Sequence, residues 1–486
     1  MRYKNFKILF VIPLEYNLLE SKVLNPGPIY PHLGIAYLSS ILMHNNFSVK
    51  VIDMRLGYKY DKISEVIKSY KPNLIAVSCY SCGYKKAYEL INKIKIHCNI
   101  PIVIGGPHAS IFKKTVLEEV AADFLVKGEG EYTLLELCNT LHSCKNNFES
   151  IRGLIWRGRS AIVENDDRPP ISDLDILPFP AFELFELKKY IRSDELPIMT
   201  SRGCPSQCVF CIVHKIFGKA FRARSPENVV AELEWWKNKG WKKFLFHDDS
   251  FTFDMKRAEE ICELIIKKNL NISWSLPNGI RVDRVNEELL YKMKEAGCAY
   301  ISYGIESGND SVLKQIKKGI TVEQAKRAIN LTEKVGIGVG ATFMIGHPTE
   351  NYKKFLDTLM FAESMPSDRT PFSHVLPYPG SELFDYVKKR GSFVQPIEKY
   401  LDNFTYFQSI PIFETKDFPL SERKKAFQLA QQLYMRKFFE KKFGKFFGLI
   451  LSQILRPKII NFPVRIIVYK TNIGNRILSF VKSNKV

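Results

Sequence analysis

Ser201-Arg-Gly-Cys-Pro-Ser-Gln-Cys-Val-Phe-Cys211 is the segment that decides the fold and the chemistry of this 486-residue chain. Its three cysteines, Cys204, Cys208 and Cys211, have the spacing C-x₃-C-x₂-C and follow a short apolar run that predicts a β-strand. Thiolates are soft ligands, suited to iron–sulfur clusters or to zinc. A [4Fe–4S] cluster normally takes four protein thiolates, so three cysteines in one loop leave the fourth iron open to another ligand.

The same segment also has a zinc interpretation. His214, three residues after the last cysteine, would then supply the fourth ligand. Zinc sites more often combine two C-x₂-C units, and this loop has only one, so the iron–sulfur interpretation is preferred. Three unrelated, buried cysteines are the remaining alternative.

Around the cysteine loop, strand-like runs alternate with helical patterns such as SPENVVAELEWWKNK and DMKRAEEICELIIKK. The strand-like runs cover residues 197–203, 243–250, 272–277, 299–307, 338–346 and 372–380. Their number within residues 196–395 predicts a partial (β/α)6 barrel, smaller than the eightfold barrel of ~250 residues. Active sites of such barrels lie at the carboxyl ends of the strands, which is where Cys204, Asp248, Glu306 and Gly346 fall.

Residues 1–145 repeat this alternation and predict a separate α/β domain. The strand-like runs are 7–13, 48–54, 73–80, 101–106 and 123–128. Strands that alternate with helices favour a doubly wound, Rossmann-like parallel sheet, in which ligands bind beyond the carboxyl ends of the strands. The residues expected at those ends are Ser78, Gly105, Gly106, Pro107, His108, Gly128, Glu129 and Gly130.

Two further regions complete the organisation. Residues 146–195 contain too many prolines for regular elements and predict a surface linker between the two domains. In residues 396–486 apolar side chains recur at three- and four-residue spacing, which predicts helices. This last region is basic, with twelve lysines and arginines against one acidic residue from Arg436 onward.

The composition narrows the class of protein. A net charge of +20 suits anionic partners such as nucleotides, nucleic acid or an anionic membrane. No stretch of roughly 18 apolar residues runs without a charge, so a membrane-spanning helix is not expected. The first residues lack the features of a signal peptide. Ten cysteines in such a chain favour a reducing compartment, so a cytoplasmic location is predicted.

The cysteine spacing, the aromatic Phe210 before the last cysteine and the β/α barrel that follows resemble the radical S-adenosylmethionine superfamily. The resemblance extends over residues 197–390. It implies that the open iron binds S-adenosylmethionine (SAM), which the reduced cluster cleaves to methionine and a 5′-deoxyadenosyl radical. An electron donor of the flavodoxin or ferredoxin type is implied as a partner.

The resemblance also implies roles for residues at the other strand ends. Asp248 and Asp249 would accept hydrogen bonds from the methionine amine, with a helix N-cap or a surface acid as the alternative. Arg281 would pair with the methionine carboxylate, or else form an ion pair with the aspartate two residues later. Glu306 would bind the ribose or the amino group, and the backbone at Gly346 would pack against adenine. Structural roles are the alternative for both.

The N-terminal domain resembles the cobalamin-binding domain that precedes many radical enzymes of this superfamily. The matching segments are 31–38, which contains Leu33 and Gly34, 103–108 and 126–131. Glycines at strand ends let the backbone approach a flat, bulky ligand, and nearby helix N-termini favour its phosphate. The chain lacks the Asp-x-His-x-x-Gly loop whose histidine ligates cobalt in the cobalamin mutases. This absence fits the subgroup that holds cobalamin without a histidine ligand. A domain that has lost the cofactor is the alternative.

The predicted function is that of a cobalamin-dependent radical SAM enzyme, with methylation of an unactivated carbon as the leading hypothesis. The resemblance implies that cobalamin carries a methyl group from one SAM and that a radical from a second SAM activates the substrate. Cyclisation or oxidation is the first alternative. A methylthiotransferase would need a second cluster, for which Cys79, Cys82 and Cys98 are the nearby trio. A non-catalytic cobalamin sensor would leave the cysteine loop unexplained.

The C-terminal region bears on the substrate. A basic, Phe-rich amphipathic helix is able to lie on an anionic membrane, which would favour a lipid substrate and an enzyme at the inner face of the membrane. A helical lid over the open side of the barrel is the alternative, with a small molecule as substrate. Nucleic acid is not expected as a partner, because no aromatic–basic binding module is present.

Overall fold

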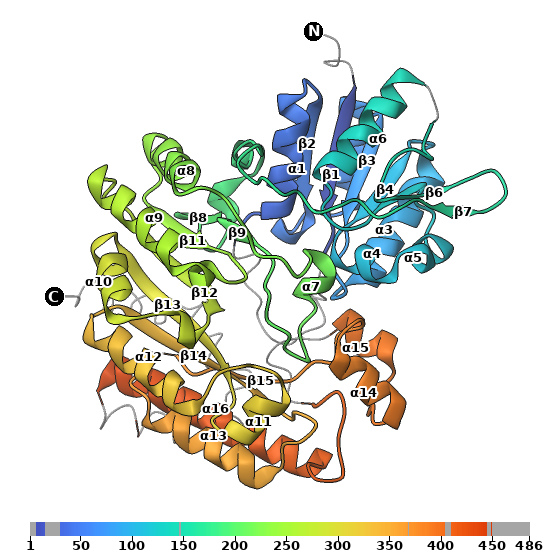
Figure 1. Cartoon of the computed structure of the whole chain (residues 1–486). Coiled ribbons are helices and arrows are strands. Elements are labelled where there is room, and N and C mark those ends of the chain that lie inside the picture. The colour runs from blue at the N-terminus through green and yellow to red at the C-terminus, as the bar shows by residue number, and fades with distance from the viewer. Residues whose placement is uncertain are drawn as a thin grey trace, which may run out of the picture.

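The first part of the chain forms a seven-stranded sheet with helices on both faces (Figure 1). The computed structural model describes residues 6–14, 30–144, 147–367, 369–403, 410–444 and 449. The strand order is β2-β1-β3-β4-β5-β6-β7. The strands are β1 (Lys7–Ile12), β2 (Ser48–Asp53), β3 (Leu74–Ser78), β4 (Ile102–Gly105), β5 (Phe124–Val126), β6 (Leu154–Arg157) and β7 (Ile162–Glu164).

Parallel pairing of β1 to β5 confirms the predicted doubly wound sheet. These strands are rich in apolar residues because helices cover both of their faces. Helices α1 (Leu33–His44) and α6 (Glu131–Ser143) pack on one face, and α2 (Tyr60–Tyr70) and α3 (Tyr84–His97) pack on the other. The strand order reverses between β1 and β3, which is where sheets of this kind bind ligands.

The predicted linker, residues 146–195, is a surface connector only in part. Its first part forms β6 and β7, which extend the sheet by antiparallel pairing beyond the boundary expected at residue 145. Its later part buries Leu174, Leu177 and Phe182 in the hydrophobic core. The prolines do exclude long elements. Strands of three or four residues and isolated apolar anchors, however, are too short for periodicity to reveal.

The second sheet confirms the partial (β/α)6 barrel, with six parallel strands in the order β15-β14-β13-β12-β11-β8. Within the described residues β8 and β15 are its two edges, so the sheet is open between them. Its helices lie along the outer side (Figure 1). The strands are β8 (Glu195–Ile198), β11 (Lys243–Phe246), β12 (Ser273–Ile280), β13 (Cys298–Glu306), β14 (Gly338–Ile345) and β15 (Phe372–His374). The helices are α8 (Pro226–Asn238), α9 (Met255–Lys267), α10 (Glu287–Glu295), α11 (Asp310–Gln315), α12 (Val322–Lys334) and α13 (Tyr352–Ser364).

A small antiparallel hairpin flanks the cysteine loop on both sides. Its strands are β9 (Ser201–Arg202) and β10 (Arg222–Ala223), with the short helix α7 (Val213–Ile216) between them. Two-residue strands give no sequence signal, so the hairpin was not predicted. Because β9 and β10 pair with each other, the two ends of the cysteine loop lie side by side.

The described part of the C-terminal region is helical, as predicted. Helix α15 (Ile397–Asn403) packs against the N-terminal sheet domain, and α16 (Leu420–Phe443) packs against α13 and β15. Helix α14 (Glu382–Arg390) lies before residue 396, in the range expected for the barrel, and it also packs against the N-terminal sheet domain. The basic stretch after residue 450 lies outside the described residues. Among those described, no helix has the length and hydropathy needed to cross a bilayer.

Candidate functional site

The cysteine loop starts at a backbone position that only glycine suits. Gly203 has φ +83°, and a Cβ on it would lie 2.4 Å from the carbonyl oxygen of Ala220. Its N–H donates to Asp249 at 3.1 Å. Further along the loop, the N–H of Val209 donates to the Ile316 carbonyl at 3.1 Å, and the Val209 carbonyl accepts from Leu383 at 2.9 Å. The loop is therefore held from the hairpin, the barrel and α14.

The three loop cysteines have free thiols with unequal exposure. Cys208 is buried, whereas Cys204 and Cys211 are half-buried. Burial raises the pKa of Cys208, and Cys204 contributes in the same direction. Burial raises the pKa of Cys211 to about 11, and Cys208 and Cys204 add to that shift. Within the described residues, no three His, Cys, Asp or Glu side chains converge tightly enough to hold one metal ion. A [4Fe–4S] cluster has a different requirement, because each cysteine binds its own iron.

A buried ion pair lies beside the cysteine loop. Lys318 donates to Glu306 at 2.8 Å, and their side chains are 11% and 8% exposed. Burial alone would lower the pKa of Lys318, but Glu306 and Cys208 outweigh it, so the pKa is raised and the lysine stays charged. A Cβ on Gly304 would lie 2.9 Å from the Glu306 carboxylate, so this glycine leaves the space for the pair. Lys318 could not be predicted as a site residue, because a lysine in a loop carries no distinguishing pattern.

Asp248 and Asp249 occupy different environments at the end of β11. Asp248 is buried and accepts hydrogen bonds from Thr200 N–H at 2.7 Å and from the Thr200 and Ser201 hydroxyls. Burial raises its pKa. These bonds give Asp248 a structural role, that of tying β11 to the start of the hairpin. Within the described residues, Asp249 accepts a hydrogen bond only from the Gly203 N–H. Burial raises the pKa of Asp249 to about 6. Asp249 thus remains the better candidate of the two for contact with SAM.

Arg281 follows the alternative interpretation, an ion pair with Asp283. The two side chains form a bidentate pair at 2.9 and 3.0 Å. The remaining donors of Arg281 reach the Ser206 hydroxyl at 3.0 Å and the carbonyls of Lys318 and Gly319. Its guanidinium is therefore committed to the protein, and it braces the cysteine loop rather than facing a free carboxylate.

Gly346, at the end of β14, is in close contact with a side chain of α16. A Cβ on Gly346 would lie 2.3 Å from the Arg423 guanidinium, which donates to the Gly346 carbonyl at 2.9 Å. The N–H groups of Gly346 and His347 donate to the buried Glu350, whose pKa burial raises to about 7. The next side chain, His347, lies 5.8 Å from the Phe210 ring, centroid to centroid. Both ring nitrogens of His347 are buried, and neither has a hydrogen-bond partner among the residues that the structure describes.

The Gly203→Ala variant is expected to lose both stability and cluster. The left-handed backbone alone costs about 1–2 kcal/mol, and the new Cβ would also displace the backbone at Ala220, which closes the hairpin. The matched control is Gly240→Ala, at φ +95° with no atom within 4 Å of the added Cβ. Thermal unfolding and iron content of both variants check the prediction. Equal losses in the two variants would contradict it.

In the N-terminal domain, the ends of β3 and β4 are joined by close backbone contacts. The Cys79 N–H donates to the Gly105 carbonyl at 2.8 Å, and a Cβ on Gly106 would lie 2.7 Å from the Cys79 carbonyl. Gly106 and the N1 proline of α4 (Pro107–Phe112) are thus explained by the fold itself. Beside them, the buried hydroxyl of Ser78 has no hydrogen-bond partner in the described part of the chain.

His108 has a structural environment. Its ring nitrogens bond the Tyr88 hydroxyl at 3.2 Å and the Ser81 hydroxyl at 3.1 Å, and its ring stacks on Tyr84 at 4.6 Å. Burial lowers its pKa to about 4, so it is neutral at pH 7. These contacts explain His108 by the fold, and its place beside a cofactor stays a prediction.

Some of the other predicted cofactor residues of this domain are exposed, and the rest are in contact with other parts of the protein. Gly34 is exposed at the start of α1, and Leu33 beside it is partly exposed. Gly128 has φ +72° with open space where a Cβ would stand, whereas Gly130 packs against Leu38 and Val126. Glu129 does not face open space: its carboxylate is 4% exposed and bound by arginines of the barrel.

The trio Cys79, Cys82 and Cys98 does not form a second cluster site. Cys82 precedes α3 and Cys98 ends it, and a 14-residue helix is about 21 Å long. Cys79 is buried in the core of the sheet domain. These three cysteines therefore do not supply the second cluster that the methylthiotransferase alternative would need.

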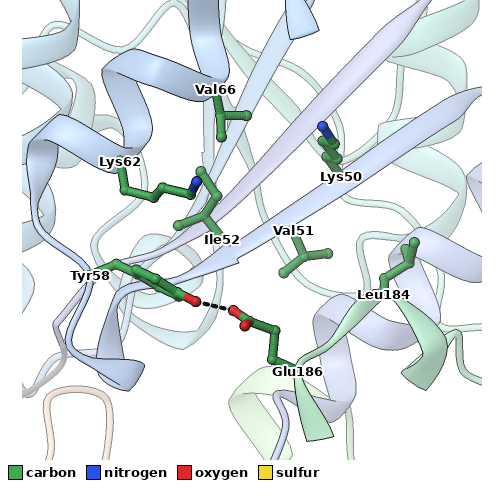
Figure 2. A pocket seen from close by; sticks show the side chains of 8 residues that line it. All are labelled: Lys50, Val51, Ile52, Tyr58, Lys62, Val66, Leu184 and Glu186. Atoms are coloured by element: carbon green, nitrogen blue, oxygen red, sulfur yellow. Dashed lines mark hydrogen bonds between the residues drawn. The ribbon is translucent and has the colours of Figure 1, made fainter. Parts of the chain in front are cut away.

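Two pockets lie outside the predicted cofactor faces or at their margin. One has a volume of about 270 Å³ and lies at the edge strand β2. Figure 2 shows its lining side chains, among which the Tyr58 hydroxyl donates to Glu186. Lys189 bonds the same hydroxyl at 2.5 Å. This pocket contains none of the predicted cofactor residues. The other, of about 340 Å³, is lined by Val209 of the cysteine loop and by residues that follow β14 and begin α14.

The residues present fit the two cofactors that the resemblance implies. Three thiols on one braced loop are a suitable donor set for a cluster with an open iron. Unpartnered buried polar atoms, which proteins normally satisfy, occur at both faces: at His347 beside the cysteine loop and at Ser78 on the sheet edge. Gly128 leaves open space at the same edge.

Comparison with protein families gives two matches along the chain. A model described as "B12 binding domain" matches residues 22–138, and one described as "Radical SAM superfamily" matches residues 198–362. The two matches fall on the seven-stranded sheet and on the partial barrel.

Relatives with curated names are similar over most of the chain. An uncharacterized methyltransferase of Pyrococcus horikoshii is 34% identical over 390 residues, which is 79% of this chain and 83% of the relative. An anaerobic magnesium-protoporphyrin IX monomethyl ester cyclase of Rubrivivax gelatinosus is 28% identical over 451 residues, covering 85% and 80%.

A solved structure has the same arrangement of domains. It is that of OxsB, described as a cobalamin-dependent S-adenosylmethionine radical enzyme, with aqua-cobalamin and S-adenosylmethionine bound. The TM-score is 0.71 at 19% identity, and the match covers 99% of this chain and 75% of the other. At this identity the likeness concerns the fold.

Proposed function

Because this chain belongs to the radical SAM enzymes with a cobalamin-binding domain, we propose that it transfers a methyl group to an unactivated carbon of a small-molecule substrate. The observation that carries the proposal is the braced three-cysteine loop of the barrel, set next to a doubly wound sheet with an open carboxyl edge. When bound, the cluster and SAM supply a 5′-deoxyadenosyl radical, and cobalamin supplies the methyl group. An external reductant is required, and a flavodoxin or ferredoxin is the expected donor.

The residues of the chain would bind and orient these groups. Cys204, Cys208 and Cys211 would hold three irons of the cluster, and their loop is kept in place by Arg281. Asp249 would accept a hydrogen bond from the methionine amine. Within the described residues, one of its carboxylate oxygens accepts the Gly203 N–H and the other accepts no hydrogen bond. Phe210 and the backbone after β14 would form the adenine side of the site.

On the sheet domain, the proposed cobalamin site lies at the carboxyl ends of β3, β4 and β5. Ser78 supplies an unpaired hydroxyl there, and the turn at Gly128 leaves room for a bulky ligand. Backbone contacts already account for the neighbouring Gly105 and Gly106. These two glycines would allow the close packing of β3 and β4 at the edge of the sheet, and they would not contact the ligand directly.

The Ser78→Ala variant is expected to weaken hydroxocobalamin binding by about fivefold, since one hydrogen bond contributes about 0.5–1.5 kcal/mol. The apoprotein should be no less stable, because the hydroxyl is buried without a partner before cobalamin binds. Absorption titration and thermal unfolding measure the two effects. The exposed Ser143 provides the control, as Ser143→Ala. Weaker binding that came with equal destabilisation would count against a direct contact.

The proposed function is tested with anaerobically purified protein, reconstituted with iron and sulfide, reduced, and supplied with hydroxocobalamin and methyl-labelled SAM. Formation of 5′-deoxyadenosine together with label in a candidate substrate is the expected outcome. Cleavage of SAM without methyl transfer would refute methylation. It would favour cyclisation or oxidation, for which similarity to the Rubrivivax gelatinosus cyclase is the supporting observation.

The location of the enzyme and its contact with a membrane are proposed from composition. A cytoplasmic enzyme is proposed because the cluster and the ten free thiols require a reducing compartment. The basic segment that would contact an anionic membrane lies mainly outside the described residues. A lipid substrate therefore stays an alternative, tested by sedimentation with anionic vesicles.

A further inference from the structure

One carboxylate joins three segments that are far apart in the sequence. Glu129, which directly follows the turn at Gly128, accepts hydrogen bonds from Arg222 at 2.8 and 3.0 Å and from Arg202 at 3.1 Å. It also accepts the N–H of Ile171, in the connector, at 2.7 Å. A side chain of the N-terminal sheet thus holds both strands of the barrel hairpin.

The contact is a closed network of buried charges. Glu131 adds a second carboxylate, 2.6 Å from Arg202, so two acids face two guanidinium groups. Glu129 and Arg202 are each 4% exposed, and Arg222 is 10% exposed. Burial alone would raise the pKa of Glu129, but Arg222 and Arg202 hold it below its usual value. Removal of one partner would leave an uncompensated buried charge, which is strongly unfavourable.

The network leads directly to the cluster loop. Arg202 is separated from Cys204 only by Gly203, whose backbone is packed against Ala220 and bonded to Asp249. A displacement of Arg202 therefore cannot be absorbed before it reaches Cys204. On the other side, Glu129 is adjacent to Gly128, where the sheet edge is open.

We propose that Glu129 is a positioning residue that couples the cobalamin face of the sheet domain to the cluster loop of the barrel. The inference rests on the proposed function, because it requires that both cofactors bind. A ligand that contacts the turn at Gly128 acts on the adjacent Glu129, and through Arg202 and Arg222 on the hairpin whose loop carries Cys204. Binding at one face and binding at the other are then linked, and linkage of binding is reciprocal.

The test uses the full-length protein with reconstituted cluster, hydroxocobalamin and labelled SAM. Equilibrium dialysis measures SAM binding with and without saturating hydroxocobalamin, and electron paramagnetic resonance records the reduced cluster in both states. In the wild type, hydroxocobalamin is expected to tighten SAM binding by at least about fivefold and to change the cluster signal. The Glu129→Gln variant should still bind iron and corrin but lose most of both changes.

A second variant covers the case in which the excess buried charge prevents folding. Glu129→Gln combined with Arg222→Gln removes one acid and one base, so Glu131 and Arg202 remain a balanced pair, and it should be uncoupled in the same way. The control is Glu136→Gln, which breaks the partly exposed pair between α6 and Arg168 without touching the hairpin. This control should keep the full coupling.

The coupling is overturned if wild-type protein with both cofactors shows neither change, or if the foldable Glu129 variant keeps both. Loss of coupling in the Glu136→Gln control would also overturn it, because the effect would then not be specific to the network. Wild-type protein that takes up no corrin would refute the proposed function and the coupling together. Iron and cobalt counts distinguish that failure from failure of the coupling alone.

Discussion

Cys208→Ala protein is expected to fold but to assemble no stable [4Fe–4S] cluster, and SAM cleavage should fall by at least about a thousandfold, as enzymes contribute at least a millionfold. Cys208 is the buried member of the three-cysteine loop, so its iron would be left with neither a thiolate nor water as a ready replacement. The thiol itself forms no bond that braces the loop. The bracing comes from the backbone at Gly203 and Val209 and from Arg281 through Ser206. Folding and cluster assembly should therefore separate.

Iron content, visible absorption and release of 5′-deoxyadenosine are the measurements. The matched control is Cys262→Ala, a fully buried cysteine on α9 that lies outside the loop. This control should keep a full complement of iron and lose only packing energy. If Cys208→Ala retained the iron and Cys262→Ala lost it, the assignment of the cluster to the loop would be wrong.

The Lys318→Met variant is expected to lose about 3–5 kcal/mol of stability, because it breaks a buried ion pair from one side and leaves Glu306 unpaired. The pair is almost fully buried, so solvent does not screen it. The same change removes a positive charge that acts on the Cys208 thiol. With less positive charge nearby an added electron is less stable, so the reduction potential of the cluster should become more negative.

The adjacent lysine offers a matched control. Lys317 forms an exposed ion pair with Glu382, with side chains 48% and 61% exposed, and such pairs contribute at most about 1 kcal/mol. Lys317→Met should therefore have little effect on stability or potential. The double variant Glu306→Gln, Lys318→Met removes both charges that act on Cys208, so it should recover part of the stability and part of the potential. Denaturant unfolding and redox titration decide this, and an unchanged potential in Lys318→Met would contradict the electrostatic argument.

The fold could be predicted from the sequence because its signals are local. Each parallel strand is a short apolar run, and each helix shows its own periodicity, so the two sheets followed from residues near each other in the chain. The two antiparallel strands β6 and β7 and the hairpin around the cysteine loop were missed. They have two to four residues each, and their pairing is decided by the surface they meet.

The site was predicted in part for the same reason. The cysteine spacing is a local pattern, and it carries the chemistry whatever surrounds it. The partners of charged groups are not local: Arg281 pairs with Asp283, Asp248 bonds Thr200, and Glu129 binds arginines more than 70 residues away. Each of these side chains was a candidate for cofactor binding, and in the structure each is bonded to other parts of the protein.

The sequence by itself therefore determined the two α/β domains, the three-cysteine loop and the family chemistry, since short-range patterns suffice for these. Only the tertiary structure decided which charged side chains form ion pairs or hydrogen bonds with other parts of the chain and which do not. Burial makes every charge find a partner, and that partner is chosen by the packing of whole domains. This requirement explains the ion pair beside Cys208 and the network that joins the two domains at Glu129. No pattern in the sequence predicts either of them.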